Sequence, residues 1–281
     1  MRKVLSIIIA HYKPNSSKDN PLYKTLSVIQ KQKSNFNIEI IIADDGSGYT
    51  NKIINNYSKK NKIENDSRNI YFLENEKLKE MLIKNNIRPN NIKRWVYLPK
   101  EENCMSKARV GNFAAISANS NNLLFIDDDN YFISKNSIRN LLKLFNNYNF
   151  IVGQIKDKSG KLRKYSSNRV QGTTIALDKN IFIDIGGFGE WTEKFSCGVD
   201  SDFWIKVFKY FEENKKLKAC FTNKVSTYDS YSKRWKKYTK FFKEILLKME
   251  FKKIYNCRNY KKSKYNLSRN KSLWIDNLSN K

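Results

Sequence analysis

Three consecutive carboxylates, Asp127, Asp128 and Asp129, follow a short apolar run at residues 123–126. Such a run without polar alternation is typical of a strand that is buried on both faces of a sheet. Adjacent carboxylates repel one another, and a divalent cation would offset this repulsion because hard cations bind carboxylate oxygens. The residues therefore predict a metal-binding strand end, and a solvated acidic turn explains them equally well.

A second pair of carboxylates, Asp44 and Asp45, follows another apolar run at residues 39–43. A similar run occupies residues 4–10, and apolar residues at helical spacing lie between the two runs, over 21–29. This order predicts a β-α-β unit with two parallel strands. Because ligands of such sheets bind beyond the carboxyl ends of the strands, Asp44 and Asp45 are candidate ligand-binding residues. A capped turn is the alternative interpretation.

The remaining pattern extends this architecture, with strands and helices alternating along the chain. Strands are predicted at 70–73, 94–98, 150–152 and 171–177; helices are predicted through 114–118 and at 76–86, 138–145 and 179–185, with a helix and polar loop over 52–65. We interpret part of residues 49–93 as an insertion. The predicted fold class is α/β, with a mostly parallel central sheet flanked by helices.

The composition is that of a folded and strongly basic protein. The 281 residues are 40% hydrophobic and 14% aromatic, which excludes a disordered chain and provides a large core. A net charge of +27 indicates attraction to polyanions such as nucleic acid, anionic lipid or phosphorylated substrates. Codon drift in an AT-rich genome would also enrich lysine. Since no nucleic-acid-binding module is recognisable, nucleic-acid binding is the least favoured function.

Two features bear on the compartment. The four cysteines are widely spaced and contain no C-x-x-C pair, which argues against a zinc site or a disulfide framework and suits a reducing environment. The N-terminal apolar run is short and lacks a cleavage site, so we interpret it as a strand rather than a signal peptide. No run approaches the roughly 18 apolar residues of a spanning helix. We expect a cytoplasmic protein, with peripheral membrane contact as an option.

Four motifs, taken in order, resemble those of the family 2 glycosyltransferases. The first strand with Asp44-Asp45-Gly46-Ser47 resembles the start of the family's GT-A fold, and Asp127-Asp128-Asp129 resembles its Asp-x-Asp motif. Residues 102–112 resemble the segment that leads into an Ala-Arg-Asn helix, and 186–204 resemble the acceptor-side motifs. The resemblance covers residues 4–210 and implies a GT-A fold with a Rossmann-like nucleotide-sugar half.

The resemblance implies a metal-dependent hexosyltransferase. Its donor would be a nucleotide-diphosphate sugar, in this family typically a UDP-sugar, and its acceptor a hydroxyl group of a glycan, a lipid-linked molecule or a protein, with inversion at the sugar. Asp45, beside Asp44, would contact the base of the donor. Arg109 would hold the diphosphate, because a guanidinium binds phosphate oxygens through paired hydrogen bonds; a solvent-facing helix arginine is the alternative.

The resemblance also assigns the metal ligands and the general base. Asp129 would bind Mn²⁺ or Mg²⁺ directly, and Asp127 or Asp128 would contact the ribose or metal-bound water, with Asp127 as the second candidate ligand. The cation would neutralise the departing UDP. Asp200 would take the proton from the acceptor hydroxyl. Asp200 also precedes an apolar helical run, so it is a candidate helix N-cap at the same time.

This chain departs from the family pattern in the segment 102–112, where Cys104-Met105 replaces a glycine and Val110 replaces an asparagine, and at two further positions. Val199 stands where the family usually has glutamate, and the only histidine, His11, is too early in the chain to match the late metal-binding histidine. We expect His11 to be a polar loop residue, and Asp229 is a candidate replacement ligand. Trp191 or Trp204 is a candidate platform for a sugar ring. The departures favour, as the alternative function, a non-catalytic module that binds sugar nucleotides or glycans.

We divide the chain into a GT-A domain and a basic extension. The domain covers 1–228, with a nucleotide-sugar half over 1–132 and an acceptor-binding half over 133–228, and the extension covers 229–281. The basic stretch 156–169 is expected to approach phosphate or sugar, or to form a hairpin. Apolar residues at helical spacing over 235–249 predict a basic amphipathic helix that packs on the domain or lies on an anionic membrane, and 252–271 would be an exposed tail.

Overall fold

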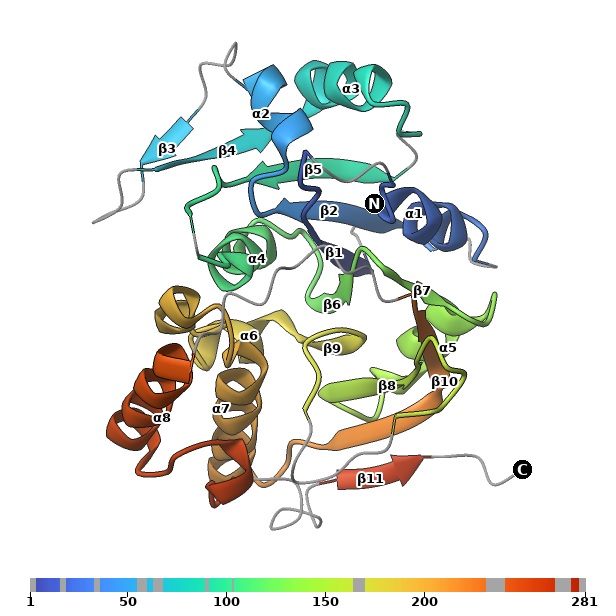
Figure 1. The fold of residues 1–281 in the computed structure, drawn as a ribbon. Helices are drawn as coiled ribbons and strands as arrows, with labels where there is room; N and C mark the ends of the chain where they lie inside the picture. The colour runs from blue at the N-terminus through green and yellow to red at the C-terminus, as the bar shows by residue number, and fades with distance from the viewer. Residues whose placement is uncertain are drawn as a thin grey trace.

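The computed structural model arranges the chain around one large sheet (Figure 1). It describes residues 4–15, 19–32, 36–54, 60–62, 68–88, 91–102, 104–163, 170–230, 241–265 and 274–277. Within these residues, no helix is both long enough and apolar enough to cross a membrane. The predicted α/β fold class is confirmed.

The strands form a sheet in the order β11-β10-β8-β9-β6-β1-β2-β5-β4-β3, and β7 pairs with β10. Among the described strands, β4, β7 and β9 run against the direction of the others, so the sheet is mostly parallel as predicted. The bounds are β1 Leu5–His11, β2 Ile38–Asp44, β3 Lys60–Lys62, β4 Asn69–Leu73, β5 Ile92–Tyr97, β6 Asn122–Asp127, β7 Asn130–Phe132, β8 Phe150–Lys156, β9 Ile175–Asp178, β10 Ala219–Asp229 and β11 Trp274–Asn277.

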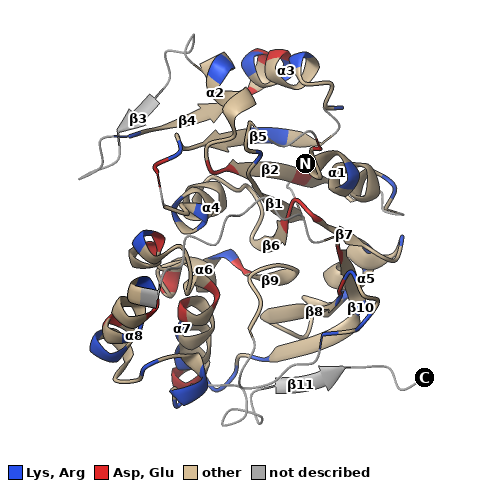
Figure 2. Cartoon of the chain, in the orientation of Figure 1, with Lys and Arg blue, Asp and Glu red and all other residues tan. Residues whose placement is uncertain are grey.

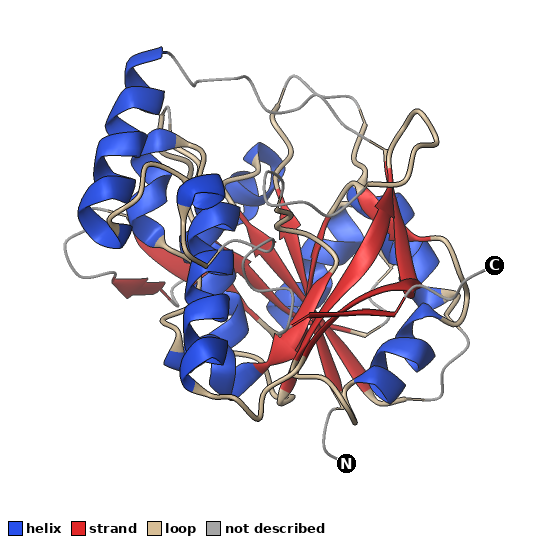
Figure 3. Ribbon diagram, turned by 90° about the horizontal axis from the view of Figure 1, so that it is seen from below, coloured by secondary structure: helices blue, strands red, loops and turns tan. Residues whose placement is uncertain are grey.

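Helices cover both faces of this sheet (Figure 3). The α-helices are α1 Leu22–Gln30, α2 Gly48–Ile54, α3 Asn75–Lys84, α4 Lys107–Ile116, α5 Ser137–Leu144, α6 Lys179–Asp184, α7 Val199–Glu213 and α8 Phe241–Tyr255, and the 3-10 helices are η1 Glu190–Phe195 and η2 Tyr260–Lys262. The two helical layers explain why the central strands are apolar on both sides.

The central strands divide their side chains between two cores. In β1, Ile7 and Ile9 belong to one buried cluster and Ile8 belongs to the other. In β2, Ile40 and Ile41 are divided in the same way. Successive strand residues point to opposite faces, so a continuous apolar run is what this double covering requires. The predicted buried strands at 4–10, 39–43 and 123–126 are confirmed.

Two element predictions are wrong in part. The strand predicted at 171–177 begins only at Ile175, because Thr174 has a positive φ of 55° and residues 172–174 form a bend. The helix predicted from 52 ends at Ile54, and residues 60–62 form β3 instead of helix or loop. The remaining residues of that prediction lie outside the described part.

The C-terminal extension contributes to the fold. β11 pairs with the edge strand β10, and Tyr260 of η2 is buried against Trp204. The part of the predicted tail at 252–265 is therefore partly packed. The predicted helix is confirmed over 241–249, while its residues 235–240 lie outside the described part of the chain. It is not amphipathic as predicted, because apolar residues occupy both its inner and its outer side.

Candidate active site

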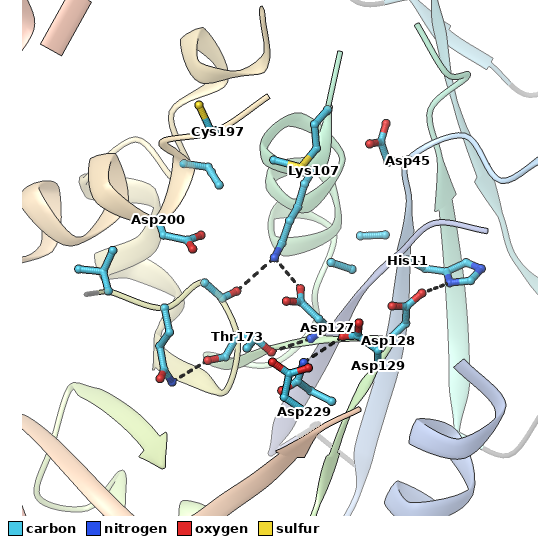
Figure 4. Close-up of a pocket in the computed structure, with 18 of the residues that line it drawn as sticks. His11, Asp45, Lys107, Asp127, Asp128, Asp129, Thr173, Cys197, Asp200 and Asp229 are labelled. Atoms are coloured by element: carbon cyan, nitrogen blue, oxygen red, sulfur yellow. Dashed lines mark hydrogen bonds and ion pairs between the residues drawn. The ribbon is translucent and has the colours of Figure 1, made fainter. Parts of the chain in front are cut away.

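A pocket lies where three neighbouring parallel strands end (Figure 4). The strands are β2, β1 and β6, and the chain leaves the central strand β1 to build the sheet on both of its sides. Open α/β sheets bind ligands at such a switch point, outside the carboxyl ends of the strands. The cavity has a volume of about 440 Å³ and is also lined by the start of α4, residues 170–173 and the start of α7. A small organic ligand fits this volume.

Asp44 and Asp45, at the end of β2, have different surroundings. Asp44 points into the fold, where its carboxylate accepts hydrogen bonds from Ser47 N at 2.8 Å, Thr50 Oγ1 at 2.6 Å and Trp95 Nε1 at 2.9 Å. It does not line the pocket. Three donors to one buried carboxylate hold the β2–α2 turn, so Asp44 has a structural role here.

Asp45 lines the pocket. Its Oδ2 accepts hydrogen bonds from Lys100 Nζ at 2.7 Å and Ser106 N at 3.1 Å. Its Oδ1 is buried and accepts no hydrogen bond from the described residues. Burial raises the pKa of Asp45 to about 6, against the attraction of Lys100. A buried acceptor without a donor costs free energy, so Oδ1 is suited to receive an N–H group from a ligand.

The three carboxylates after β6 also differ. Asp127 Oδ1 accepts a hydrogen bond from Lys107 Nζ at 2.5 Å, and the Asp127 amide donates to Thr173 Oγ1 at 2.8 Å. Asp129 Oδ1 accepts from Asn130 Nδ2 at 3.0 Å. Both carboxylates line the pocket. Burial raises the pKa of Asp127 to about 6, and the nearby charge of Asp129 adds to this rise.

Asp128 is held by the chain's only histidine. Its Oδ2 lies 2.5 Å from His11 Nδ1 and 3.3 Å from the Tyr12 amide, and His11 Nε2 lies 2.6 Å from the Tyr49 hydroxyl. Both ring nitrogens of His11 are therefore engaged. The expectation that His11 is a polar loop residue is wrong: it ends β1 and is buried, because Asp128 and Tyr49 satisfy it. This network positions the turn after β6, and the donor-binding role of Asp128, which lines the pocket, stays a prediction.

Lys107, the first residue of α4, is a cation of the pocket that no sequence motif indicated (Figure 4). Its ammonium contacts Asp127 Oδ1 and lies 3.5 Å from the carbonyl oxygen of Gly172. Burial alone would lower the pKa of Lys107, but the carboxylates of Asp127 and Asp200 outweigh it and raise this pKa to about 12. Lys107 is therefore charged at neutral pH and links opposite walls of the pocket.

Arg109 lies two residues further along α4 and does not line the pocket. Residues two apart on a helix differ by about 200° in direction, so Lys107 and Arg109 face opposite ways. The guanidinium of Arg109 donates two hydrogen bonds to Glu193 Oε2 and Oε1, with Nη2 at 3.1 Å and Nε at 3.2 Å. This pairing joins α4 to η1. The diphosphate contact of Arg109 stays a prediction, while Lys107 is the cation of α4 that faces the pocket.

Asp200, in the first turn of α7, faces Lys107 across the pocket (Figure 4). Burial raises its pKa, and the charges of Lys107 and Arg163 oppose that rise. A Cβ at Gly172 would lie 1.9 Å from Asp200 Oδ1, so only glycine admits the carboxylate at this place. The structure gives Asp200 no side-chain cap hydrogen bond for α7, whose N-cap is Gly198.

Asp229, at the end of β10, is brought to the same pocket. It lies opposite Asn130 in the pairing of β10 with β7, and Ser230 N donates to the Asp129 carbonyl at 3.0 Å. Arg163 donates to Asp229 Oδ2 and lines the pocket. The described part of 156–169 forms the predicted hairpin, in which Lys156 pairs with Leu162, and its contact with phosphate or sugar stays a prediction. The ligand role of Asp229 stays a prediction.

The aromatic platform is not formed by the predicted residues. Trp204 is fully buried and donates from Nε1 to the Gln171 carbonyl at 2.8 Å, so that prediction is wrong. Trp191 packs against Phe251 and donates to Asp202 Oδ1 at 2.8 Å, outside the pocket. Both indoles instead hold the walls of the site.

The carboxylates of Asp127 and Asp129 offer the oxygen atoms that Mn²⁺ and Mg²⁺ prefer. No three acidic, histidine or cysteine side chains among the described residues are close enough to hold a metal by themselves. Mg²⁺ sites at phosphate substrates usually use one or two carboxylates and complete the coordination with phosphate oxygens and water. The residues present fit a cation of this kind, which binds together with a diphosphate.

No family model and no curated protein matches the chain. Solved structures do: residues 1–349 of TarS from S. aureus in complex with UDP-GlcNAc align over 90% of this chain and 67% of that one, at a TM-score of 0.58 and 15% identity. The mannosyltransferase PcManGT from Pyrobaculum calidifontis, in complex with GDP-Man and Mn²⁺, aligns over 83% of this chain at a TM-score of 0.52 and 14% identity. The chain has a glycosyltransferase fold. It spans 59% of the length of the mannosyltransferase.

Within this glycosyltransferase fold, the pocket brings together six of the predicted site residues from four segments of the chain. They are Asp45, Asp127, Asp128, Asp129, Asp200 and Asp229. Asp44 and Arg109 lie outside the lining, and Asp128 lines it but is engaged by His11. Lys107 and Arg163 add the positive charge. The pocket thus combines a buried oxygen of Asp45 that accepts no hydrogen bond from the described residues, the carboxylates of Asp127 and Asp129 with the Lys107 ammonium beside Asp127, and the separate carboxylate of Asp200.

Proposed function

We propose that this chain is a glycosyltransferase that moves a sugar from a nucleotide-diphosphate donor, of the UDP-sugar type, to an acceptor hydroxyl with inversion. The observation that carries the proposal is the shared pocket of Asp45, Lys107, Asp127, Asp129 and Asp200 at the ends of adjacent parallel strands. The TarS and PcManGT structures, which hold UDP-GlcNAc and GDP-Man, support it through their fold. The order of the acidic motifs supports a family 2, GT-A type enzyme with an Asp-x-Asp motif.

The donor would lie along the strand ends. Asp45 Oδ1, buried and without a hydrogen-bond donor among the described residues, would accept the ring N–H of a uracil. The ammonium of Lys107 would move from Asp127 toward the diphosphate, since charged donors bind phosphate oxygens well. Mn²⁺ or Mg²⁺ at Asp129 and Asp127 would supply neutralisation of the charge that develops on the leaving nucleoside diphosphate.

The acceptor would approach from the α7 side. Asp200 would accept the proton of the attacking hydroxyl, and the raised pKa of its carboxyl makes it a better base than an ordinary aspartate. The nearby positive charge of Lys107 opposes the rise that burial causes in the pKa of Asp200. Val199, beside it, is buried in the core, so one carboxylate would do this work alone.

The proposal is tested by a donor screen. Purified protein is incubated with UDP- and GDP-sugars, with Mn²⁺, with Mg²⁺ or with a chelator, and the released nucleotide is measured. We expect slow release of one nucleotide even without acceptor, because water can replace the hydroxyl. A nucleotide sugar that binds tightly, with no turnover of any donor even when cell extract is added as a source of acceptors, would instead support the non-catalytic binding module. Absence of both binding and turnover would refute both functions.

Asp45→Ala is expected to weaken uridine binding by about tenfold or more, the range for a lost hydrogen bond to a charged group. Uridine lacks the diphosphate, so an NMR titration with it reports the base contact separately from Asp127. Since burial raises the pKa of Asp45 to about 6, the charged acceptor exists above this pH, and wild-type affinity should fall as the pH drops through it. Asp184→Ala, an exposed aspartate on α6, is the control. Equal affinities of wild type and Asp45→Ala would remove the base contact from the proposal.

Asp129→Ala is expected to abolish the increase of UDP affinity that Mn²⁺ produces in the wild type. The change should be about tenfold or more, because a cation between carboxylate and diphosphate stabilises the complex by several kcal/mol. Calorimetric titration of UDP with and without Mn²⁺ measures it, and Asp157→Ala, on an exposed turn, is the control. A variant that keeps the full Mn²⁺ effect would show that Asp129 is not a ligand.

Gly172→Ala is expected to lower turnover by about 100-fold, the cost of a displacement of about 1 Å at a reacting group. The added methyl group would occupy the place of Asp200 Oδ1, 1.9 Å away. Donor affinity should change little. Gly111→Ala is the matched control, since a Cβ there meets only Phe188 at 3.4 Å. Steady-state kinetics distinguish the two variants, and normal turnover of Gly172→Ala would contradict the placement of Asp200.

A further inference from the structure

Helix α8 is apolar on two opposite sides. Leu247, Phe251 and Tyr255 recur every four residues and pack against the main core, and Phe251 is only 2% exposed. Tyr255 also donates a hydrogen bond from its hydroxyl to the buried carboxylate of Asp202. Residues four apart lie on one side of a helix, so this inner side fastens α8 to the domain.

The outer side of α8 carries a second apolar stripe. Phe242 is 74% exposed, Leu246 is 50% exposed and Met249 is 62% exposed, and Ile245 lies between them. These residues follow the spacing i, i+3, i+4, i+7 of one helix face. At 3.6 residues per turn, the stripe lies about 180° from the inner side. Exposed aliphatic groups in one stripe, rather than scattered singly, indicate a contact surface.

Basic residues outnumber acidic ones along α8 and the segment that follows it (Figure 2). Lys248, Lys252 and Lys253 are exposed beside it and at its end, and Arg258, Lys261 and Lys262 are exposed on the segment that follows. Residues 241–265 contain eight lysines and arginines and two glutamates. The surface is therefore both apolar and basic.

The inner side of α8 lies directly behind a wall of the pocket. A Cβ at Gly198, which lines the pocket, would lie 3.1 Å from a methyl carbon of Leu247 and 3.4 Å from the ring of Phe251. Gly198 is the N-cap of α7, the helix that begins with Val199 and Asp200. The helix with the exposed stripe thus supports the wall that carries Asp200.

We propose that the outer face of α8, formed by Phe242, Ile245, Leu246 and Met249 with its flanking lysines, docks the protein on an anionic membrane surface. The inner side of α8 is packed on the domain, so its outer side alone is available to a membrane, where an exposed apolar stripe can enter the headgroup region and each lysine near anionic lipid adds to binding. The composition favours lipid over a protein partner, because the cores of protein interfaces are depleted in lysine. The inference does not depend on the proposed transferase activity.

Sedimentation of the full chain with vesicles tests the proposal. One set of vesicles contains phosphatidylcholine alone, and the other also contains phosphatidylglycerol. We expect the wild type to bind the anionic vesicles, to bind phosphatidylcholine far more weakly, and to lose binding as salt rises. Wild type that binds neither kind of vesicle would overturn the proposal.

Two variant pairs locate the contact. Leu246→Ser with Met249→Ser removes the stripe, and Ile116→Ser with Ile183→Ser is its control, since these residues on α4 and α6 are 61% and 50% exposed. Lys252→Glu with Lys253→Glu reverses charge on α8, and Lys31→Glu with Lys93→Glu does so at exposed positions elsewhere. Each α8 variant should lose about tenfold or more in vesicle binding, and each control should keep it.

Other outcomes overturn the proposal. Equal losses in an α8 variant and its control would show that general basicity or stability, rather than this face, governs binding. Wild type that self-associates in sizing experiments, with the association lost in Leu246→Ser with Met249→Ser, would assign the stripe to a second copy of the chain. Thermal melting of each variant confirms that the protein remains folded, which is expected because all substituted side chains are exposed.

Discussion

Asp200→Asn is expected to lower the rate of sugar transfer by about 10² to 10⁴-fold, the contribution of a positioned general base, and to leave donor affinity nearly unchanged. The amide has the size of the carboxylate, so it still fits beside Gly172, where a single Cβ would already collide with Asp200 Oδ1. It cannot take a proton from the acceptor hydroxyl. Transfer is measured by steady-state kinetics and donor affinity by calorimetry, with Asp184→Asn as the control.

The raised pKa of Asp200 also predicts the direction in which the rate of sugar transfer changes with pH. Burial raises the pKa of Asp200 above the ordinary value of an aspartate, and the base works only when it is deprotonated. Wild-type transfer should therefore fall as the pH drops through this raised pKa, and the residual activity of Asp200→Asn should lack that limb. Equal losses of donor binding and transfer would count against Asp200 as the base and assign it to donor binding.

The positions of the carboxylates at the strand ends could be predicted because hydrophobic cores lie on both faces of the sheet. A strand covered on both faces must be apolar at every position, so the runs before Asp45 and Asp127 stand out in a chain of mostly polar composition. In parallel strands the following residues meet at one edge of the sheet. The grouping of Asp45 with Asp127 and Asp129 in one pocket follows from this rule alone.

The direction of each side chain could not be predicted in this way. Neighbouring carboxylates differ through partners that are distant in sequence: Asp128 is held by His11, 117 positions earlier, and Asp44 is held in part by Trp95. Neither partner carries a local signal. In the sequence, a buried histidine whose two nitrogens contact a carboxylate and a hydroxyl cannot be distinguished from any other polar residue that follows a strand.

The side of a helix that faces the pocket could not be predicted either. The sequence predicts a helix through 114–118, and in the structure this helix begins at Lys107 and contains Arg109. Both are cations, but only one of two residues that differ by about 200° can face the pocket. Resemblance favoured Arg109, while the structure pairs it with Glu193. The same limit applies to α8, because apolar residues occupy both of its sides and their spacing alone does not show which side packs against the domain. Leu247 and Phe251 face the core, and the stripe from Phe242 to Met249 is exposed.

Lys107→Met is expected to weaken metal-free UDP binding by about tenfold or more, the range for a lost hydrogen bond between charged groups. The ammonium is the basic group that contacts Asp127, and it lies close enough to Asp129 and Asp200 for their charges to raise its pKa. Without it, the pocket presents several carboxylates to an anionic diphosphate. Lys107→Arg should restore part of the affinity, because it keeps the charge, and Lys143→Met, on the exposed side of α5, is the control.

Two further readouts separate an electrostatic role of Lys107 from a purely structural one. The positive charge lowers the pKa of Asp127, which burial has raised to about 6, so Lys107→Met should move the acid limb of UDP binding to higher pH. Mn²⁺ should reduce the loss of affinity, since a cation at the same carboxylates replaces the missing charge. A variant that loses affinity equally with and without Mn²⁺, with an unmoved acid limb, would show that Lys107 only holds the loop at Gly172 in place; unchanged metal-free affinity would remove Lys107 from the donor site.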